Sequence, residues 1–451
     1  MTLAAAASAV SAVLHGADRP FSGVSTDTRT LAAGELFVAL KGDRFDAHDH
    51  LADAAAQGAA GALVARRQPV DIAQLEVADT RLALGRLAAA WRARFAVPCV
   101  AVTGSNGKTT TKELLAAILR RQGAVLVTEG NLNNDIGVPQ TLFRLGAGHR
   151  CAVIEMGANH AGEIAYLCTL ARPDVALVTM AGPAHLEGFG SLAGVARAKG
   201  EVFQGLGGRG TAVVNADDAH APLWRELAAG ARILDFGFTS GAAVHAEDFV
   251  QRPLGEGSTF TLVTPQGRAP MALPLDGRHN VMNALAAAAC AVALDVPLVE
   301  IAGGLASCAG VKGRLQLKAG VNGLVVVDDT YNANPASLEA ALAVLASRPG
   351  RRWLLLGDMG ELGPDGAELH REAGRIAKRL GIERLLTLGE LSTFADETFG
   401  AGAAHFASCE EAVAAIREAA APDVTLLVKG SRFMRLERVV AALDARGHRT
   451  C

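Results

Sequence analysis

One glycine-rich string constrains the fold more than any other part of this 451-residue chain. Residues 103–110 read TGSNGKTT, follow the apolar run 97–102 and precede TKELLAAIL, which has a helical pattern. In a strand–loop–helix unit of this kind, backbone N–H groups and the helix N-terminus bind phosphate. We therefore expect Lys108 to reach nucleotide phosphates and the Thr109 hydroxyl to bind Mg²⁺. Because Val102 stands where the general phosphate-loop pattern has its first glycine, a tight turn before an ordinary helix is the alternative.

Composition and charge exclude several classes of protein. Half of the residues are hydrophobic and 20% are charged, which is typical of a globular protein. The net charge of −3 gives no basic footprint for nucleic acid. The seven cysteines are scattered without a CxxC pair, which argues against a disulfide framework or a zinc site. Residues 1–14 are alanine-rich but lack a positive leader region, so we predict a helix there, no membrane insertion and a cytoplasmic protein.

Alternating apolar runs and helical segments predict an α/β protein with mostly parallel sheets. The length is enough for two to four domains. The expected central strands are residues 97–102, 151–155, 175–179 and 211–215, and the expected C-terminal strands are residues 324–327, 353–356, 384–388 and 425–428. Helices are expected at residues 82–95 and 281–294. The predicted domains are residues 1–96, 97–310 and 311–451.

Polar residues at the strand ends are the first candidates for a site, because ligands bind at the carboxyl ends of parallel strands. Glu155 ends a buried strand, so it is a candidate Mg²⁺ ligand, with a helix cap or a surface salt bridge as the alternative. His185 lies in the loop after the next strand and should reach the same sheet edge. An exposed loop histidine is the alternative there.

Lys199 stands on the apolar stripe of a predicted helix that begins after Ser191. The stripe consists of Leu192, Val195, Val202, Phe203 and Leu206. A buried ammonium is costly unless it is paired or neutralised. A snorkelling side chain is one explanation, and pairing with Glu201 is disfavoured because neighbours two apart face different sides of a helix. The functional alternative is that Lys199 is neutral or chemically modified near the phosphate site.

Several strings in family order, over nearly the whole chain, resemble the Mur ligases. They are TGSNGKTT, EMGANH from Glu155, AHLEGFGS, the segment around Lys199 and GRHNVMNALAA. The family comprises ATP-dependent amide-forming enzymes of peptidoglycan precursor synthesis. The resemblance implies an N-terminal UDP-sugar-binding domain, a central P-loop ATPase domain and a C-terminal Rossmann-like domain. The strings at 130–139, 328–335, 356–363 and 429–432 resemble members that join D-alanyl-D-alanine to UDP-N-acetylmuramoyl-tripeptide, and the DNPR string of diaminopimelate-adding members is absent.

The resemblance also implies roles for individual residues. Lys108, Lys199, His185 and Arg314 would be catalytic, and Lys199 matches the lysine that becomes carbamylated. Two Mg²⁺ ions would be held by Thr109, Glu155, His185 and Lys199. ATP would be bound by Gly104, Ser105, Asn106, Gly107, Lys108, Thr109, Thr110, Asn280, Asn283, Arg314 and Asp329. The substrates would be bound by Asp27, Thr28, Arg29, Asn133, Asn134, Asn332, Asn334, Asp358, Lys429 and Ser431.

The sequence departs from the family pattern at two places, and two alternative functions are considered. Met180-Ala181 replaces an asparagine-containing pair and Asp46-Ala47-His48 replaces a DGH string. The nearest alternative is another ligase of the superfamily, such as a folate glutamate ligase. The other is a nucleotide-driven switch or a small-molecule kinase, which would need no amine. We expect a monomer that binds no nucleic acid, and the third residue of the tripeptide stays open.

Overall fold

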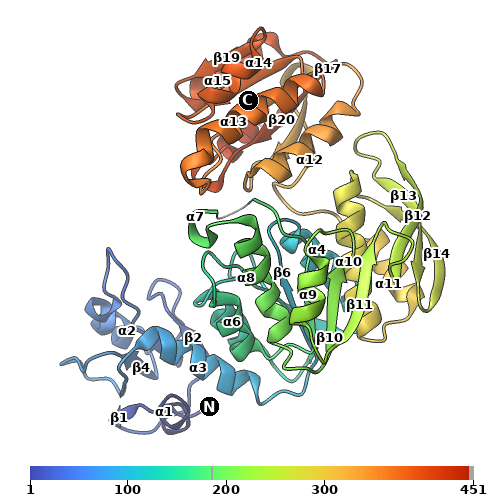
Figure 1. Ribbon diagram of the computed structural model, residues 1–451. Coiled ribbons are helices and arrows are strands. Elements are labelled where there is room, and N and C mark those ends of the chain that lie inside the picture. The colour runs from blue at the N-terminus through green and yellow to red at the C-terminus, as the bar shows by residue number, and fades with distance from the viewer. Residues whose placement is uncertain (184–185, 446–451) are drawn as a thin grey trace.

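The computed structural model describes residues 1–183 and 186–445 and contains three separate β-sheets (Figure 1). In Figure 1 the N-terminal sheet lies at lower left, the central sheet in the middle and the C-terminal sheet at the top. Buried apolar clusters lie on both sides of the central and C-terminal sheets. This arrangement confirms the predicted α/β class with three domains. Among the described helices, none is both long and apolar enough to cross a bilayer.

The N-terminal sheet has the strand order β1-β5-β4-β3-β2, with only β1 antiparallel to its neighbour. Its elements are α1 Leu3–Val10, β1 Val13–His15, β2 Val24–Ser25, β3 Leu36–Val38, α2 Leu51–Ala56, β4 Gly61–Val64, β5 Gln74–Glu76 and α3 Thr80–Arg92. The predicted helix over 1–14 is wrong beyond Val10, because Ser11 adopts a left-handed conformation (φ 58°) that ends α1 and lets the chain enter β1.

The central sheet has nine strands in the order β14-β13-β12-β11-β10-β9-β6-β8-β7, parallel from β7 to β12 and antiparallel beyond. The strands are β6 Cys99–Thr103, β7 Ala124–Val127, β8 His149–Glu155, β9 Val175–Val178, β10 Thr211–Asn215, β11 Arg232–Gly237, β12 Val244–Gln251, β13 Ser258–Thr264 and β14 Gly267–Leu273. The helices are α4 Lys108–Arg120, α5 Gly137–Phe143, α6 Glu163–Ala171, α7 Leu186–Phe189, α8 Leu192–Gln204, α9 Ala221–Leu227, α10 Arg278–Ala293 and α11 Leu298–Ala306.

The C-terminal sheet has the order β15-β16-β20-β17-β18-β19, and only β15 is antiparallel to its neighbour. Its strands are β15 Gln316–Ala319, β16 Val325–Asp329, β17 Arg351–Gly357, β18 Arg384–Leu388, β19 Ala403–Phe406 and β20 Val424–Lys429. Its helices are α12 Pro335–Ala346, α13 Gly366–Arg379, α14 Thr393–Phe399, α15 Cys409–Ala419 and α16 Glu437–Leu443. Short 3₁₀ helices are Ala47–His50, Val321–Gly323, Gly363–Asp365 and Arg432–Met434.

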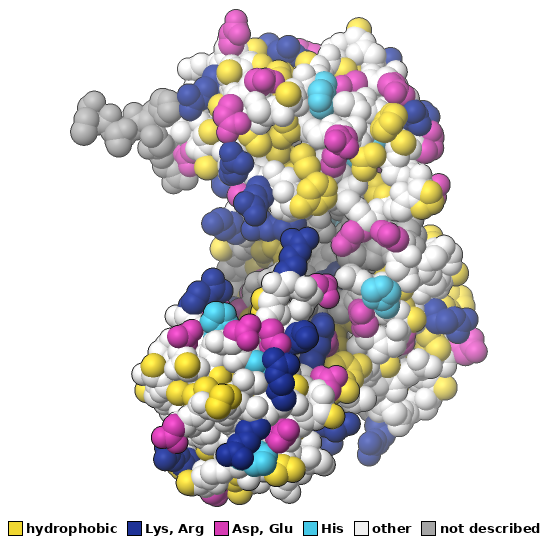
Figure 2. Space-filling view, turned by 90° about the vertical axis from the view of Figure 1, so that its left-hand side faces the viewer, with side chains coloured by type: hydrophobic (Ala, Val, Ile, Leu, Met, Phe, Trp, Pro, Cys, Tyr) yellow, Lys and Arg dark blue, Asp and Glu magenta, His cyan; other side chains and the backbone are white. Residues whose placement is uncertain are grey.

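A cleft of about 1800 Å³ lies where the central and C-terminal domains face each other. Figure 2 shows a hollow between the upper and lower parts of the molecule, with Lys and Arg side chains along its edges. The ends of β6, β8 and β10 and the residues after β16 and β20 line this cleft. Polar residues that follow buried strands in two different sheets therefore meet in one place. Parallel topology brings them to the carboxyl edge of each sheet, and the arrangement of the two domains brings the two edges together.

Candidate active site

The phosphate loop joins β6 to α4 and has the geometry of an anion cradle. Gly104 and Gly107 have φ values of 141° and 79°, which favour glycine. A side chain at Gly104 would collide with the Thr179 hydroxyl, and one at Gly107 with the amide of Asn283. Lys108 folds back over the loop and donates from Nζ to the Gly104 carbonyl at 2.6 Å. Burial lowers the pKa of Lys108, while the nearby carboxylate of Glu155 opposes that shift.

Glu155 ends β8, and only one of its two carboxylate oxygens accepts a hydrogen bond from the described residues. Its side chain is 2% exposed, and Oε1 accepts a hydrogen bond from Asn133 Nδ2 at 2.8 Å. Oε2 is buried and has no hydrogen-bond donor among the residues that the structure describes. A buried carboxylate oxygen in that state is costly, and a hard cation would satisfy it. The environment of Glu155 therefore suits the predicted role of a Mg²⁺ ligand better than the role of a helix cap or of a surface salt bridge.

Lys199 is buried on α8, as its place on the apolar stripe predicted. Its side chain is 1% exposed, and Nζ donates to the Ala158 carbonyl at 3.1 Å. Burial, reinforced by the charge of Lys108, lowers the pKa of Lys199 to about 7. Leu192 is the one stripe member that the prediction misplaced, because it is 41% exposed at the first turn of the helix.

Glu201 does not explain the buried lysine. Its carboxylate accepts hydrogen bonds from the Gly162 and Ala165 backbone N–H groups at the start of α6, at 2.7 and 3.1 Å. The aromatic ring of Phe189 lies 5.1 Å from Lys199 Nζ. His185, the other predicted ligand on this side, lies outside the described residues. Within residues 1–183 and 186–445, no three His, Cys, Asp or Glu side chains cluster so that they could hold a metal by themselves.

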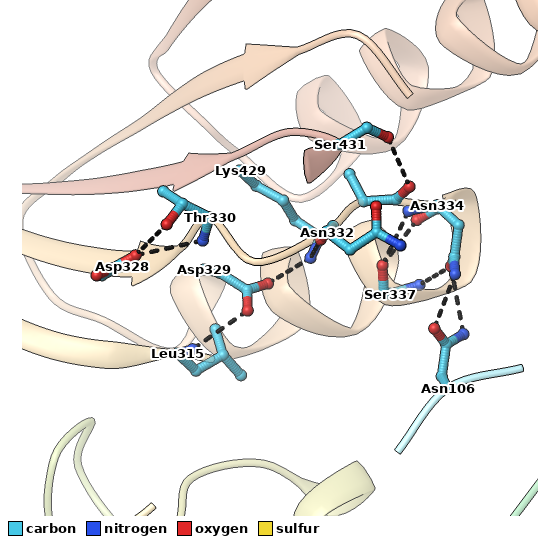
Figure 3. A network of polar contacts seen from close by, with 11 residues as sticks. Asn106, Leu315, Asp328, Asp329, Thr330, Asn332, Asn334, Ser337, Lys429 and Ser431 are labelled. Atoms are coloured by element: carbon cyan, nitrogen blue, oxygen red, sulfur yellow. Dashed lines mark hydrogen bonds and ion pairs between the residues drawn. The ribbon is translucent and has the colours of Figure 1, made fainter. Parts of the chain in front are cut away.

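The C-terminal domain contacts the phosphate loop directly. Arg314 donates from Nη2 to Thr109 Oγ1 at 3.0 Å, and its guanidinium lies over the Tyr331 ring at 4.3 Å. The amides of Asn106 and Asn334 exchange two hydrogen bonds, at 2.8 and 3.2 Å, which Figure 3 shows as the link between the domains. Arg314, a nucleotide-binding candidate of the C-terminal domain, thus contacts Thr109, a nucleotide-binding candidate of the central domain.

A polar network behind Asn334 orders the strand ends of the C-terminal sheet (Figure 3). Lys429 donates to Asp329 Oδ2 at 2.5 Å and to the Asn332 carbonyl at 2.9 Å. Ser431 donates to the Ala333 carbonyl at 3.2 Å. The side chain of Lys429 is nearly fully buried, so this ion pair fixes the β16 and β20 ends next to the cleft.

The predicted adenine-site residues lie on the central domain's wall of the cleft, beside the phosphate loop. Asn280 and Asn283 lie on the first turns of α10, and Asn283 donates to Asn280 Oδ1 at 3.2 Å. Sequence reasoning missed Phe238 and Phe249, whose rings meet edge to face on this wall, with the Arg278 guanidinium 3.5 Å from the Phe238 ring centroid. They come from the end of β11 and from β12, in a part of the sheet for which no strand was predicted.

The remaining predicted residues divide between the cleft and more distant positions. Asn133 and Asn134 line the cleft. Asp27, Thr28 and Arg29 lie in the N-terminal domain after β2 and do not line it, and hydrogen bonds from Arg29 lower the pKa of Asp27 to about 2. Asp358 also does not line the cleft, because its carboxylate accepts the Ser392 backbone N–H at 2.7 Å.

The loop that departs from the family pattern is tied to the phosphate loop. The Ser105 backbone N–H donates to the Met180 carbonyl at 2.9 Å, and its hydroxyl accepts from the Gly182 N–H at 2.9 Å. Asp218 accepts the Ala181 N–H at 2.9 Å. The loop contributes only backbone groups to these contacts, so they form without the asparagine expected in place of Met180-Ala181.

A phosphate loop on a mostly parallel sheet, faced across a cleft by a second mostly parallel sheet, is the arrangement typical of P-loop nucleotide-binding proteins. Residues 102–291 match the Mur ligase middle domain, and residues 313–432 match the Mur ligase, glutamate ligase domain. The chain belongs to the Mur ligase family. The resemblance inferred from its motifs is thereby confirmed.

Individual relatives are similar over nearly the whole chain. The UDP-N-acetylmuramoyl-tripeptide–D-alanyl-D-alanine ligase of Escherichia coli (strain K12) is 47% identical over 97% of this chain and 96% of its own length. The crystal structure of MurF from Acinetobacter baumannii superposes with a TM-score of 0.91 at 39% identity, covering 97% of each chain. MurF ligase from Thermotoga maritima in complex with ADP gives 0.82 at 27% identity, covering 93% of this chain and 96% of its own.

Proposed function

We propose that the protein is an ATP-dependent ligase that joins D-alanyl-D-alanine to UDP-N-acetylmuramoyl-tripeptide, giving the pentapeptide precursor of peptidoglycan. The observation that carries the proposal is the cleft in which the phosphate loop, Glu155 and Lys199 face the polar strand ends of a second domain. The choice of substrates is supported by the ligase of Escherichia coli, whose name states this reaction.

Each domain would bind one ligand. Residues 1–96 would bind the UDP-linked substrate, with Asp27, Thr28 and Arg29 at its contact region. Residues 97–310 would bind ATP. Residues 311–451 would bind the dipeptide through Asn332, Asn334, Lys429 and Ser431, which all line the cleft, while Asn133 and Asn134 would face the tripeptide.

The reaction would proceed in two steps. An oxygen of the tripeptide's terminal carboxylate attacks the γ-phosphorus of ATP, so an acyl phosphate forms and ADP leaves. The amine of D-alanyl-D-alanine then attacks the acyl carbon, and an amide, phosphate and a proton result. Lys108 and Arg314 hold positive charge where the transferring phosphoryl group develops negative charge, which is the main requirement of this chemistry. A closed cleft keeps water from hydrolysing the acyl phosphate.

Two Mg²⁺ ions fit the residues of the site. Thr109 and the unpartnered oxygen of Glu155 would hold the first ion. Lys199, as a carbamate, would help to hold the second with His185 and Glu155. When bound, such ions neutralise phosphate charge and align the reacting oxygens. A neutral Lys199 amine forms the carbamate by bonding to the carbon of CO₂ and losing a proton, and its lowered pKa makes that amine available.

We also propose that the protein is a cytoplasmic monomer. The described cysteines Cys99, Cys151, Cys168, Cys290, Cys308 and Cys409 are all free thiols, and five of them are buried. Burial raises the pKa of these five thiols, which keeps them unreactive. Such a set suits a reducing compartment.

A mass-spectrometric assay tests the proposed reaction. The full chain is incubated with ATP, Mg²⁺, UDP-linked tripeptide and D-alanyl-D-alanine, with single amino acids in place of the dipeptide as controls. We expect the pentapeptide product only with the dipeptide. Product with a single amino acid, or a phosphate ester formed on a hydroxyl group without any amine, would refute the proposal.

A further inference from the structure

A second fully buried lysine lies close to the phosphate loop, and the proposed reaction does not use it. Lys112 stands one turn after Thr109 on α4, and its side chain is 1% exposed. Nζ donates to the Thr128 carbonyl at 2.6 Å and pairs with Glu113 Oε1 at 2.8 Å. Placing an ammonium in the protein interior is costly, so these partners must offset that cost.

Thr128 connects this lysine to Glu155. It follows β7, next to β8 in the sheet, and its side chain is buried. Its hydroxyl accepts the backbone N–H of Glu155 at 2.9 Å. Its own N–H donates to the Val153 carbonyl at 3.1 Å. Where β7 ends, the Thr128 hydroxyl thus replaces a backbone carbonyl as the acceptor for β8. The backbone position of Glu155 therefore depends on the position of Thr128.

The loop after Thr128 closes around the Glu155 carboxylate. Asn133 donates to Oε1 at 2.8 Å and accepts the Gly157 N–H at its own carbonyl, also at 2.8 Å. A Cβ at Gly157 would lie 2.9 Å from Asn133 Oδ1, so a larger residue there would push the Asn133 side chain out of its present position. Lys112 anchors the first residue of this loop to the same helix that carries Thr109. Lys112 therefore links Thr109 to Glu155, the two residues that are proposed to hold the first Mg²⁺.

We infer that Lys112 and Thr128 are positioning residues that hold Glu155 at the correct place relative to Thr109 for Mg²⁺ binding. This inference rests on the proposed function, in which Thr109 and Glu155 share that ion. Neither Lys112 nor Thr128 lines the cleft. Their effect is on the affinity of the site for a cation, because partners of a ligand fix its orientation before the ion arrives.

The test measures Mn²⁺ binding to the full chain with saturating ADP by electron paramagnetic resonance, and ADP binding without metal by calorimetry. Lys112→Met and Thr128→Val should each weaken Mn²⁺ binding about tenfold, while metal-free ADP binding stays unchanged. Glu113→Gln is the matched control, because it removes the ion pair to Lys112 and leaves the Lys112–Thr128 hydrogen bond. It should bind Mn²⁺ like the wild type.

Three results would overturn this account. Folded Lys112→Met and Thr128→Val variants with wild-type Mn²⁺ affinity would refute the inference. If Lys112→Met does not fold, Thr128→Val decides alone, since it keeps both the chain shape and the Lys112 contact. An equal loss of metal-free ADP binding would show general damage to the phosphate loop. A wild-type chain that binds no Mn²⁺ with ADP would instead refute the proposed function.

Discussion

Replacing Lys199 by Met should stabilise the folded chain near neutral pH although it removes a residue proposed to be essential. The pKa of Lys199 falls from 10.5 to about 7 because the amine is buried. A tenfold change in a proton equilibrium is worth about 1.4 kcal/mol, so protonating this lysine in the folded chain costs roughly 5 kcal/mol more than in the unfolded chain. Methionine fills a similar volume without this cost.

The sign of the pH dependence follows from the two pKa values. Between pH 7 and pH 10.5 the unfolded chain holds the Lys199 proton and the folded chain does not, so the wild type gains stability as the pH rises. The full penalty applies below pH 7. The stability difference between Lys199→Met and the wild type should therefore shrink by about 2.5 kcal/mol from pH 7 to pH 9.

Urea unfolding in metal-free, CO₂-free buffer measures this difference. Trp224 reports on the correct region, because its Nε1 donates to the Ala196 carbonyl of α8 at 2.9 Å. Trp91 and Trp353 are replaced by Phe in both chains so that only Trp224 fluoresces. Parallel stability curves for the two chains across this pH range would refute the reasoning that Lys199 is a buried, readily neutralised amine.

Three further predictions concern the cleft. Lys199→Ala should abolish phosphate release, and added short carboxylates should restore part of it; full activity without them would exclude a carbamate role. Glu155→Gln should weaken Mn²⁺ binding with ADP by tenfold or more, because an amide is a poorer cation ligand; calorimetry that shows wild-type affinity would remove Glu155 from the metal site. Asn106→Ala removes both hydrogen bonds to Asn334 but keeps the cap of α12, so small-angle scattering of the ligand-free chain should show a larger radius of gyration. Unchanged scattering would mean that this pair does not hold the C-terminal domain.

The strands that could be predicted in the central and C-terminal sheets belong to parallel pairs and have continuous apolar runs. Residues 384–388 form β18 as predicted, and β6 differs from its prediction by two residues at the start and one at the end. The antiparallel strands β13 and β14 were missed. Buried and partly exposed residues alternate along β13, which weakens an apolar run, and Pro270 interrupts the pattern of β14.

Residues of the candidate site could be predicted where the site depends on local sequence patterns, but not where it depends on the arrangement of domains. Glu155 could be found because it ends a buried strand, and Lys199 because a charge disturbs the apolar stripe of its helix. Lys112 carries the same signal, since it lies on one helix face with Leu115 and Leu119, but that signal was overlooked beside the phosphate loop. The pair Asn106–Asn334 joins residues 228 positions apart, so no local pattern could reveal it.

The transfer of one oxygen atom tests the central claim most directly. UDP-linked tripeptide labelled with ¹⁸O in its terminal carboxylate is incubated with ATP, Mg²⁺, D-alanyl-D-alanine and the full chain, and the released phosphate is analysed by mass spectrometry. An acyl phosphate predicts one ¹⁸O atom in each phosphate, because the carboxylate oxygen that attacks the γ-phosphorus leaves with it. Unlabelled phosphate alongside new amide would contradict the proposed mechanism.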